Sequence, residues 1–384
     1  MKALLIGGTG PTGPHIIRGL LDRGYAVTML NRGSRDSDAI PPEVERLIGD
    51  PHFPDTLETA LGDRSFDIAI ATYGRIRYVA EVLSTRTNRL ITIGGTPSYR
   101  GFADAAANFP AGMPVPTTET DATVETANEG KFSYLVKQTE DAVMRQHTEG
   151  HMNVTHFRYP VVYGPWQLRT VIFEWTMQRC RDRRPHAILP DGGLTLLTRG
   201  YSENMAHAVL LAVDQPGASA GKIYNCGDDR QFTLAQWVEV ISKEMDWPLQ
   251  IVPVPDAFAS PAREMITFYG SSHHQLLEID AIRRDLGYRD IVDPVEGIRR
   301  TVADIKAHPS DPEKIAEITK FYDIEDRLAE IYGTAASAAA ALDHDEADYH
   351  QPMRIRASAA WSAITATVDR LACRRARSAH PYFQ

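Results

Sequence analysis

The stretch LLIGGTGPTG at residues 4–13 carries glycines at every third position, at 7, 10 and 13. The run KALLIG at 2–7 leads into it and is short, apolar and continuous, as in a strand buried on both faces of a parallel sheet. After it, PHIIRGLLDRG at 14–24 has apolar residues at helical spacing, and YAVTMLNRG at 25–33 is typical of a second strand. A strand, a glycine-rich turn, a helix and a strand in this order predict the first unit of a dinucleotide-binding fold.

The three glycines of this turn have different expected roles. Gly7 permits the tight turn out of the strand, Gly10 lets the backbone approach a pyrophosphate, and Gly13 lets the helix pack closely on the strand. The unpaired N–H groups at the helix start favour phosphate binding. The alternative is a glycine-rich turn without a ligand. The cofactor contacts expected here are Gly7, Thr9, Gly10, Pro11, Thr12 and Gly13.

The second strand ends in LNRGSR at 30–35, where NAD enzymes usually place an Asp or Glu that binds the ribose hydroxyls. This chain has Asn31 and Arg32 there, with Arg35 nearby. A carboxylate would repel a 2′-phosphate, whereas a guanidinium can bind one through paired hydrogen bonds. The sequence therefore favours NADP(H) over NAD(H), against the alternative that Arg32 is only a solvated surface charge.

Further strands are predicted at 44–50, 66–74, 88–95 and 152–165, with helical stretches between most of them. This alternation predicts a doubly wound parallel sheet, in which ligands bind beyond the carboxyl ends of the strands. Residues that follow those strands are therefore expected to contact the cofactor. They are Asp50, near the adenine amino group, and Ala71, Thr72, Tyr73, Pro160 and Val162.

The predicted fold class is α/β: a Rossmann-type doubly wound parallel sheet, a smaller α+β substrate lobe and a helical C-terminal extension. The expected domains are 1–165 for dinucleotide binding, 166–310 for the substrate lobe, whose strand segments could return to the first domain, and 311–384 for the extension. In the lobe, Thr233 and Gln236 fit a capping box at a helix start. The extension is expected to cover the substrate cleft or a neighbouring subunit.

Composition limits the class of function. The formal net charge of -9 argues against general nucleic-acid binding, which needs a basic surface. The three cysteines form no CxxC pair, and the adjacent His273 and His274 have no second ligand cluster, so we expect no metal site. With neither a signal peptide nor a long apolar run expected, we predict a cytoplasmic protein with a small-molecule substrate, no nucleic-acid partner and no membrane contact. Whether the protein forms a homodimer stays an open question at this point.

Several of these stretches resemble one superfamily. GGTGPTG at 7–13, FRYPVVYGP at 157–165 and IYNCGDDRQFTLAQWVEVI at 223–241 are similar to the extended, epimerase/dehydratase-like branch of the short-chain dehydrogenases/reductases. NRGSR at 31–35 and RLIGD at 46–50 are most similar to its isoflavone-reductase-like and atypical members. The resemblance covers roughly residues 1 to 305 and is far more specific for the superfamily than for a substrate.

The resemblance implies a mechanism from which this chain departs. Members use a tyrosine for proton transfer, a lysine four residues later that also holds the nicotinamide ribose, and a Ser or Thr after the fifth strand, while hydride passes to or from the nicotinamide. In KFSYLVKQTEDAV, Lys137 fits the lysine, but Ser133 stands four residues before it and Tyr134 three. Gly95 stands at the Ser/Thr position, with Thr96 beside it. Either Tyr134, Lys137 and Thr96 form a shifted working set, or the catalytic set has been lost.

These observations lead to one preferred function and two alternatives. The preferred one is an NADP(H)-dependent oxidoreductase that reduces a carbonyl, or oxidises an alcohol, on a small organic substrate. The alternatives are a nucleotide-sugar epimerase/dehydratase and a non-catalytic NADP(H)-sensing regulatory protein. RNA binding, as in some plastid relatives, conflicts with the acidic charge. If Tyr134 is inert, Tyr73, Tyr99 or Tyr163 could supply a hydroxyl.

Overall fold

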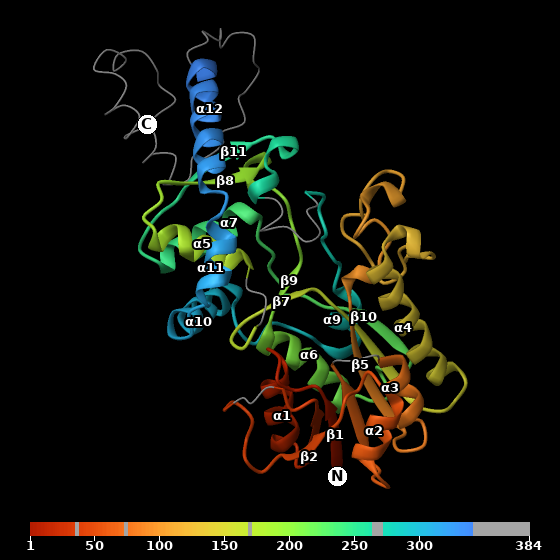
Figure 1. Ribbon diagram of the computed structural model, residues 1–384. Helices are drawn as coiled ribbons and strands as arrows, with labels where there is room; N and C mark the ends of the chain where they lie inside the picture. Colours follow the sequence, from red (N-terminus) through yellow and green to blue (C-terminus); the bar gives the residue numbers. More distant parts are fainter. Residues whose placement is uncertain (35–37, 73–75, 168–170, 263–271, 341–384) are drawn as a thin grey trace. The chain divides into compact units, whose positions relative to one another are not determined.

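The computed structural model describes residues 1–34, 38–72, 76–167, 171–262 and 272–340 (Figure 1). The chain forms two compact units built from interleaved segments. Unit 1 comprises residues 1–170, 196–231 and 273–308, and unit 2 comprises 171–195, 232–272 and 309–384. Two segments of the predicted substrate lobe, 196–231 and 273–308, thus group with residues 1–170, and the described part of the extension, 311–340, groups with unit 2.

Unit 1 contains a seven-stranded parallel sheet in the order β10-β6-β5-β4-β1-β2-β3. The chain runs outward from β1 to β3 and then returns to β4 beside β1, so strand order reverses between β1 and β4. Ligands bind at such a reversal in open α/β sheets. The strands are β1 (Lys2–Ile6), β2 (Ala26–Asn31), β3 (Glu45–Ile48), β4 (Ile68–Ala71), β5 (Arg89–Gly95), β6 (Asn153–Tyr159) and β10 (Lys222–Asn225).

Helices cover both faces of this sheet (Figure 1). Alternate residues of β1 point to opposite faces: Leu5 lies in a core with α1 and α6, and Leu4 and Ile6 lie in a core with α2, α3 and α4. Because both faces of the sheet are buried, β1 and β4 are continuous apolar runs in the sequence. This pattern is why the sequence alone predicted both strands. The helices are α1 (Gly13–Asp22), α2 (Pro54–Leu61), α3 (Ile76–Leu83), α4 (Lys131–Thr148), α6 (Ser202–Asp214), α9 (Asp280–Leu286) and α10 (Pro294–Ala307).

The predicted strand at 152–165 divides into two. β6 ends at Tyr159 in the main sheet, and β7 (Val161–Tyr163) instead pairs in parallel with β9 (Arg199–Tyr201). Pro160 separates the two strands, and it has no N–H to continue the ladder. The motif FRYPVVYGP therefore carries the chain out of the sheet at the edge where ligands bind.

Unit 2 is smaller and pairs two parallel strands, β8 (His186–Pro190) and β11 (Gln250–Val254). Its helices are α5 (Val171–Arg181), α7 (Leu234–Glu244), α11 (Pro312–Thr319) and α12 (Tyr322–Ala340). The predicted capping box is confirmed, because Thr233 Oγ1 accepts from the Gln236 N–H and Gln236 Oε1 accepts from the Thr233 N–H. Glu325 of α12 forms a buried ion pair with Arg179 of α5, so α12 is anchored to this unit.

In the described part of the chain, no helix has both the length and the apolar character needed to cross a membrane.

Candidate functional site

The first cavity of unit 1, here called the glycine cavity, lies at the carboxyl ends of the strands where strand order reverses. Its volume is about 340 Å³. Ten of the expected cofactor contacts line it together with four other residues. The lining residues are Gly7, Gly8, Thr9, Gly10, Pro11, Thr12, Gly13, Asn31, Arg32, Ser34, Thr72, Ile93, Tyr159 and Val162.

The glycines of the turn have the geometry that a bound diphosphate needs. Gly7 has a φ of 104°, which L side chains rarely adopt. A Cβ on Gly13 would lie 2.1 Å from the carbonyl oxygen of Gly8, so the start of α1 packs directly on the turn. A Cβ on Gly10 would meet nothing within 4 Å. The backbone at Gly10 is therefore open for close approach by a ligand, and the residues fit a dinucleotide.

Helix α1 supplies the positive end of its dipole to this cavity. Thr12 is its N-cap residue and makes no side-chain capping bond, and the first turn of the helix holds no acidic residue. The N–H groups of the first turn have no partners within the helix, and this end of a helix carries about +0.5 of a charge. An anionic group in the cavity would thus be stabilised by the backbone itself.

The end of β2 carries a cation where NAD enzymes usually carry an acid. Arg32 is exposed and lines the cavity, and Asn31 Oδ1 accepts from the Gly33 N–H at 2.9 Å. Asp50 is a carboxylate close enough to Arg32 to feel its charge. The pKa of Asp50 is lowered by hydrogen bonds from the backbone and imidazole of His52 and by the charge of Arg32. Asp50 does not line the cavity, so its contact with adenine stays a prediction.

The other expected cofactor contacts are placed as follows. Ala71 and Pro160 are buried directly beside the lining residues Thr72 and Tyr159. Thr72 donates its hydroxyl to the carbonyl of Ile6 at 3.0 Å. Arg35 and Tyr73 lie outside the described residues.

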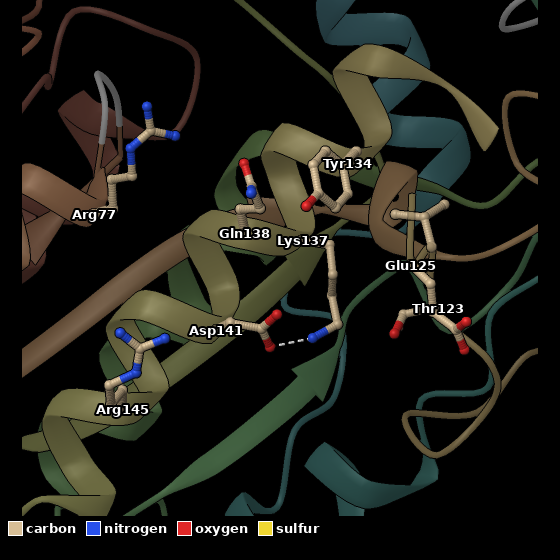
Figure 2. A pocket seen from close by; sticks show the side chains of 9 residues that line it. Arg77, Thr123, Glu125, Tyr134, Lys137, Gln138, Asp141 and Arg145 are labelled. Atoms are coloured by element: carbon tan, nitrogen blue, oxygen red, sulfur yellow. Dashed lines mark hydrogen bonds and ion pairs between the residues drawn. The ribbon is translucent and has the colours of Figure 1, made fainter. Parts of the chain in front are cut away.

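A second cavity, the α3–α4 groove, contains the expected proton-transfer pair (Figure 2). Tyr134 and Lys137 both line it, and its volume is about 670 Å³. Figure 2 shows Tyr134, Gln138, Asp141 and Arg145 along α4, with Arg77 opposite them on α3. The groove shares no lining residue with the glycine cavity.

Neighbouring positions on α4 explain why Tyr134 lies in the groove. Ser133, which precedes Lys137 by four residues, has no exposed surface, and its hydroxyl has no hydrogen-bond partner in the described structure. A tyrosine at that position would be directed into packed protein. Tyr134 is one residue further around the helix and is half-buried at the groove, on the same side as Lys137.

Thr96, the third expected catalytic residue, lines neither cavity. It is buried in the short 3-10 helix Thr96–Ser98, and its hydroxyl donates to the carbonyl of Tyr159 at 3.0 Å. The helix Thr96–Ser98 contacts α4, which carries Tyr134 and Lys137, so the catalytic role expected for Thr96 stays a prediction. Lys137 lines the groove and not the glycine cavity, and its contact with a nicotinamide ribose stays a prediction.

Beneath the groove lies a buried charged cluster that sequence reasoning missed. Glu140 accepts two hydrogen bonds from Arg158, at 2.7 and 2.8 Å, and lies 3.6 Å from both Lys137 Nζ and His156 Nε2. Burial alone would raise the pKa of Glu140, but Arg158 outweighs it and the pKa is lowered. His156 Nδ1 bonds Thr92 Oγ1 at 2.7 Å, and burial lowers the pKa of His156 to about 4. The cluster ties the groove lysine to β5 and β6.

The two other candidate hydroxyls that the structure describes, those of Tyr99 and Tyr163, already form hydrogen bonds. Tyr99 donates to Asn225 at 2.7 Å, and burial raises its pKa to about 12. Tyr163 donates to Asp228 at 2.7 Å, and burial raises its pKa well above the usual value. Tyr159 lines the glycine cavity but donates to the carbonyl of Met205 at 2.8 Å.

Asp228 predicts a pH dependence of stability. Burial, with the neighbouring Asp290, raises its pKa to about 7. The folded chain then binds more protons than the unfolded chain above the ordinary pKa of 3.8, so the contribution of this group to stability is lost as the pH rises towards 7. We expect urea denaturation of Asp228→Asn to show a weaker decline in stability between pH 4 and 7 than the wild type. Equal slopes for both proteins would contradict this assignment.

No group of three or more potential metal ligands is clustered anywhere in the described ranges.

Comparison with known proteins finds a matching family model for part of the chain and two similar proteins. Residues 101–227 match the model of the NAD dependent epimerase/dehydratase family. The uncharacterized protein YbjS of Escherichia coli is 29% identical over 32% of this chain, and the match spans 41% of that protein. The chloroplast stem-loop binding protein of 41 kDa b of Arabidopsis thaliana is 24% identical over 77% of each chain.

Solved structures share the fold. UDP-glucose 4-epimerase of Thermotoga maritima superposes with a TM-score of 0.63 at 18% identity, covering 81% of this chain and all of that chain. dTDP-glucose 4,6-dehydratase of Bacillus anthracis superposes with a TM-score of 0.63 at 13% identity, covering 80% of this chain and 97% of that chain. The chain therefore shares the fold of these enzymes, with its seven-stranded parallel sheet, and its residues 101–227 match the epimerase/dehydratase family model.

Proposed function

We propose that this protein is an NADP(H)-dependent oxidoreductase that reduces a carbonyl, or oxidises an alcohol, on a small organic substrate. The observation that carries the proposal is the glycine cavity: an open backbone at Gly10, a helix start without an acidic residue, and Arg32 at the end of β2. Structures with the same fold, such as the Thermus thermophilus UDP-glucose 4-epimerase, are complexes with NAD. The dinucleotide supplies hydride chemistry when bound.

The residues of the cavity divide the binding task. The N–H groups at the start of α1 hold the diphosphate, and the backbone at Gly10 allows its close approach. Arg32 binds the 2′-phosphate, which an acid at that position would repel. The predicted contacts of Arg35 and Tyr73 remain part of the proposal.

Arg32 is the direct test of the cofactor preference. We expect Arg32→Gln to weaken NADPH binding by about 10- to 100-fold, the value of a charge-assisted hydrogen bond, and to leave NADH binding unchanged. Isothermal titration calorimetry with both cofactors measures this. Arg18→Gln, an exposed arginine of α1 outside the cavity lining, serves as the control. Equal losses for NADPH and NADH would contradict a 2′-phosphate site.

Tyr134 and Lys137 are the proposed proton-transfer pair. Both line the groove, and Lys137 is held by Asp141 and by Glu140. The Lys137 ammonium would stabilise a tyrosinate on the same side of α4, and Tyr134 would then give a proton to the carbonyl oxygen or take one from the alcohol. Thr96, whose hydroxyl donates to Tyr159, would hold the β5 loop rather than a substrate oxygen.

Turnover of Tyr134→Phe tests this role. General acid–base groups contribute about 10²- to 10⁴-fold, so we expect a fall of that size in kcat with unchanged NADPH affinity. Tyr332→Phe in α12 is the matched control, measured in the same carbonyl-substrate screen. Unchanged kcat in Tyr134→Phe would remove this residue from the mechanism.

Two alternatives are supported by specific observations. A nucleotide-sugar epimerase or dehydratase is favoured by the matched family and by the solved structures that share the fold. A non-catalytic NADP(H)-sensing protein is favoured by the separate linings of the groove and the glycine cavity. Tight NADPH binding without turnover on carbonyl compounds or nucleotide sugars would select the sensor.

Several predictions about partners and location belong to the same proposal. The net charge of -9 supports the absence of a nucleic-acid partner, although one relative is named for stem-loop binding. Filter binding with a stem-loop RNA at physiological salt tests this prediction. The cytoplasmic location and a homodimer stay predictions.

A further inference from the structure

The α3–α4 groove contains two guanidinium groups whose charge is not balanced by a carboxylate of the described residues. Of the groove's acids, Glu125 pairs with Arg100 at 3.0 Å, and Asp141 pairs with Lys137. Arg77 and Arg145 then remain, and neither forms an ion pair with a described residue. The chain has more carboxylates than cations, at a net charge of -9, yet within the described ranges no carboxylate pairs with either arginine.

The two guanidiniums are also free to bind. Arg77 Nη2 makes one long contact, 3.4 Å to the hydroxyl of its neighbour Tyr78, and lies over that ring at 4.8 Å. No side-chain hydrogen bond of Arg145 is found within the described structure. Arg77 projects from α3 and Arg145 from α4, and the Gln138 amide also lines the groove (Figure 2).

This donor set fits one ligand chemistry. Guanidiniums match the oxygens of phosphate with paired hydrogen bonds, and an amide adds a neutral donor. The groove's volume of about 670 Å³ leaves room for an organic moiety beside Tyr134. We propose that the α3–α4 groove is a phosphate site, which binds the phosphate group of a small phosphorylated compound through Arg77 and Arg145. That this compound is the substrate rests on the proposed function, whereas the phosphate site does not.

Titration with inorganic pyrophosphate tests the site on the full chain. We expect Arg77→Gln and Arg145→Gln each to raise the dissociation constant about tenfold, and the double variant about 100-fold. Arg181→Gln, an exposed arginine of α5 outside the groove, is the charge-matched control and should bind as wild type.

The glycine cavity is a second place where pyrophosphate could bind, so its own variants separate the two sites. Pyrophosphate binding that is lost in Gly10→Ala but unchanged in both groove variants would overturn the proposal. The groove variants should bind NADPH with the affinity of the wild type. This result distinguishes a failure of the proposed cofactor site from a failure of the proposed phosphate site.

Two other outcomes would also overturn the phosphate site. If Arg77→Gln and Arg145→Gln change the mass measured by light scattering and leave pyrophosphate affinity unchanged, the arginines serve contact with a second copy. If they weaken stem-loop RNA binding while pyrophosphate neither binds nor competes, the groove binds a nucleic acid instead.

Discussion

Gly13→Ala is expected to abolish NADPH binding and to destabilise the fold by about 1–3 kcal/mol or more, the cost of overpacking a site that cannot relax. The added Cβ would lie 2.1 Å from the Gly8 carbonyl oxygen and 2.3 Å from its carbonyl carbon, and both are backbone atoms. The start of α1 would have to move away from the turn, and its N–H groups would no longer face the diphosphate. Urea denaturation and NADPH calorimetry measure the two effects.

Gly10→Ala is the matched comparison, because a Cβ there meets nothing within 4 Å. We expect its stability to change by less than about 0.5 kcal/mol, as for an unhindered surface position, and NADPH binding to weaken at least about tenfold. Comparing Gly13→Ala with Gly10→Ala therefore distinguishes the effect of a packing clash from the effect of blocking the approach of a ligand. Full NADPH affinity in Gly10→Ala would mean that no ligand passes close to this backbone.

Glu140→Gln is expected to cost about 3–5 kcal/mol of unfolding free energy, the usual loss when one partner of a buried ion pair is removed. The substitution keeps the shape of the side chain but leaves Arg158, which is 3% exposed, without its counter-charge. Lys137 also loses a carboxylate at 3.6 Å. Chemical denaturation gives the free energy directly.

The control for this loss is an exposed charge cluster on α10. Glu296 bonds Arg299 and Arg300 at 2.6 and 2.7 Å, and all three side chains are at least one-third exposed. Exposed pairs contribute about 0–1 kcal/mol, so Glu296→Gln should change stability little. Similar losses for Glu140→Gln and Glu296→Gln would show that the buried cluster does not stabilise the fold.

The sequence predicted the sheet of unit 1 well because its strands are short apolar runs bounded by glycine and polar residues. The glycine-rich turn after β1 shows the limit of this: the structure leaves open space at Gly10 and places Gly13 against the Gly8 backbone, but the pyrophosphate contact expected at Gly10 stays a prediction. These properties are local. A strand buried on both faces leaves the same pattern whichever strands flank it.

The site was harder to predict because its contacts join distant segments. Spacing along α4 placed Tyr134 and Lys137 together, but it could not show that Arg77 of α3 faces the same groove. The cluster around Glu140 was missed for the same reason. Its sequence signal is the pair His156 and Arg158 inside an otherwise apolar strand, since a buried charge requires a partner elsewhere.

The interleaving of segments has a consequence for biosynthesis. β10, the partner of β6 in the sheet, enters only at residue 222, and the last helix of unit 1 ends at Ala307. A nascent chain released or paused after residue 165 would expose the unpaired edge of β6, which can pair with another nascent chain. Synthesis on the ribosome must therefore proceed past Ala307 before unit 1 can complete both its sheet and its covering helices.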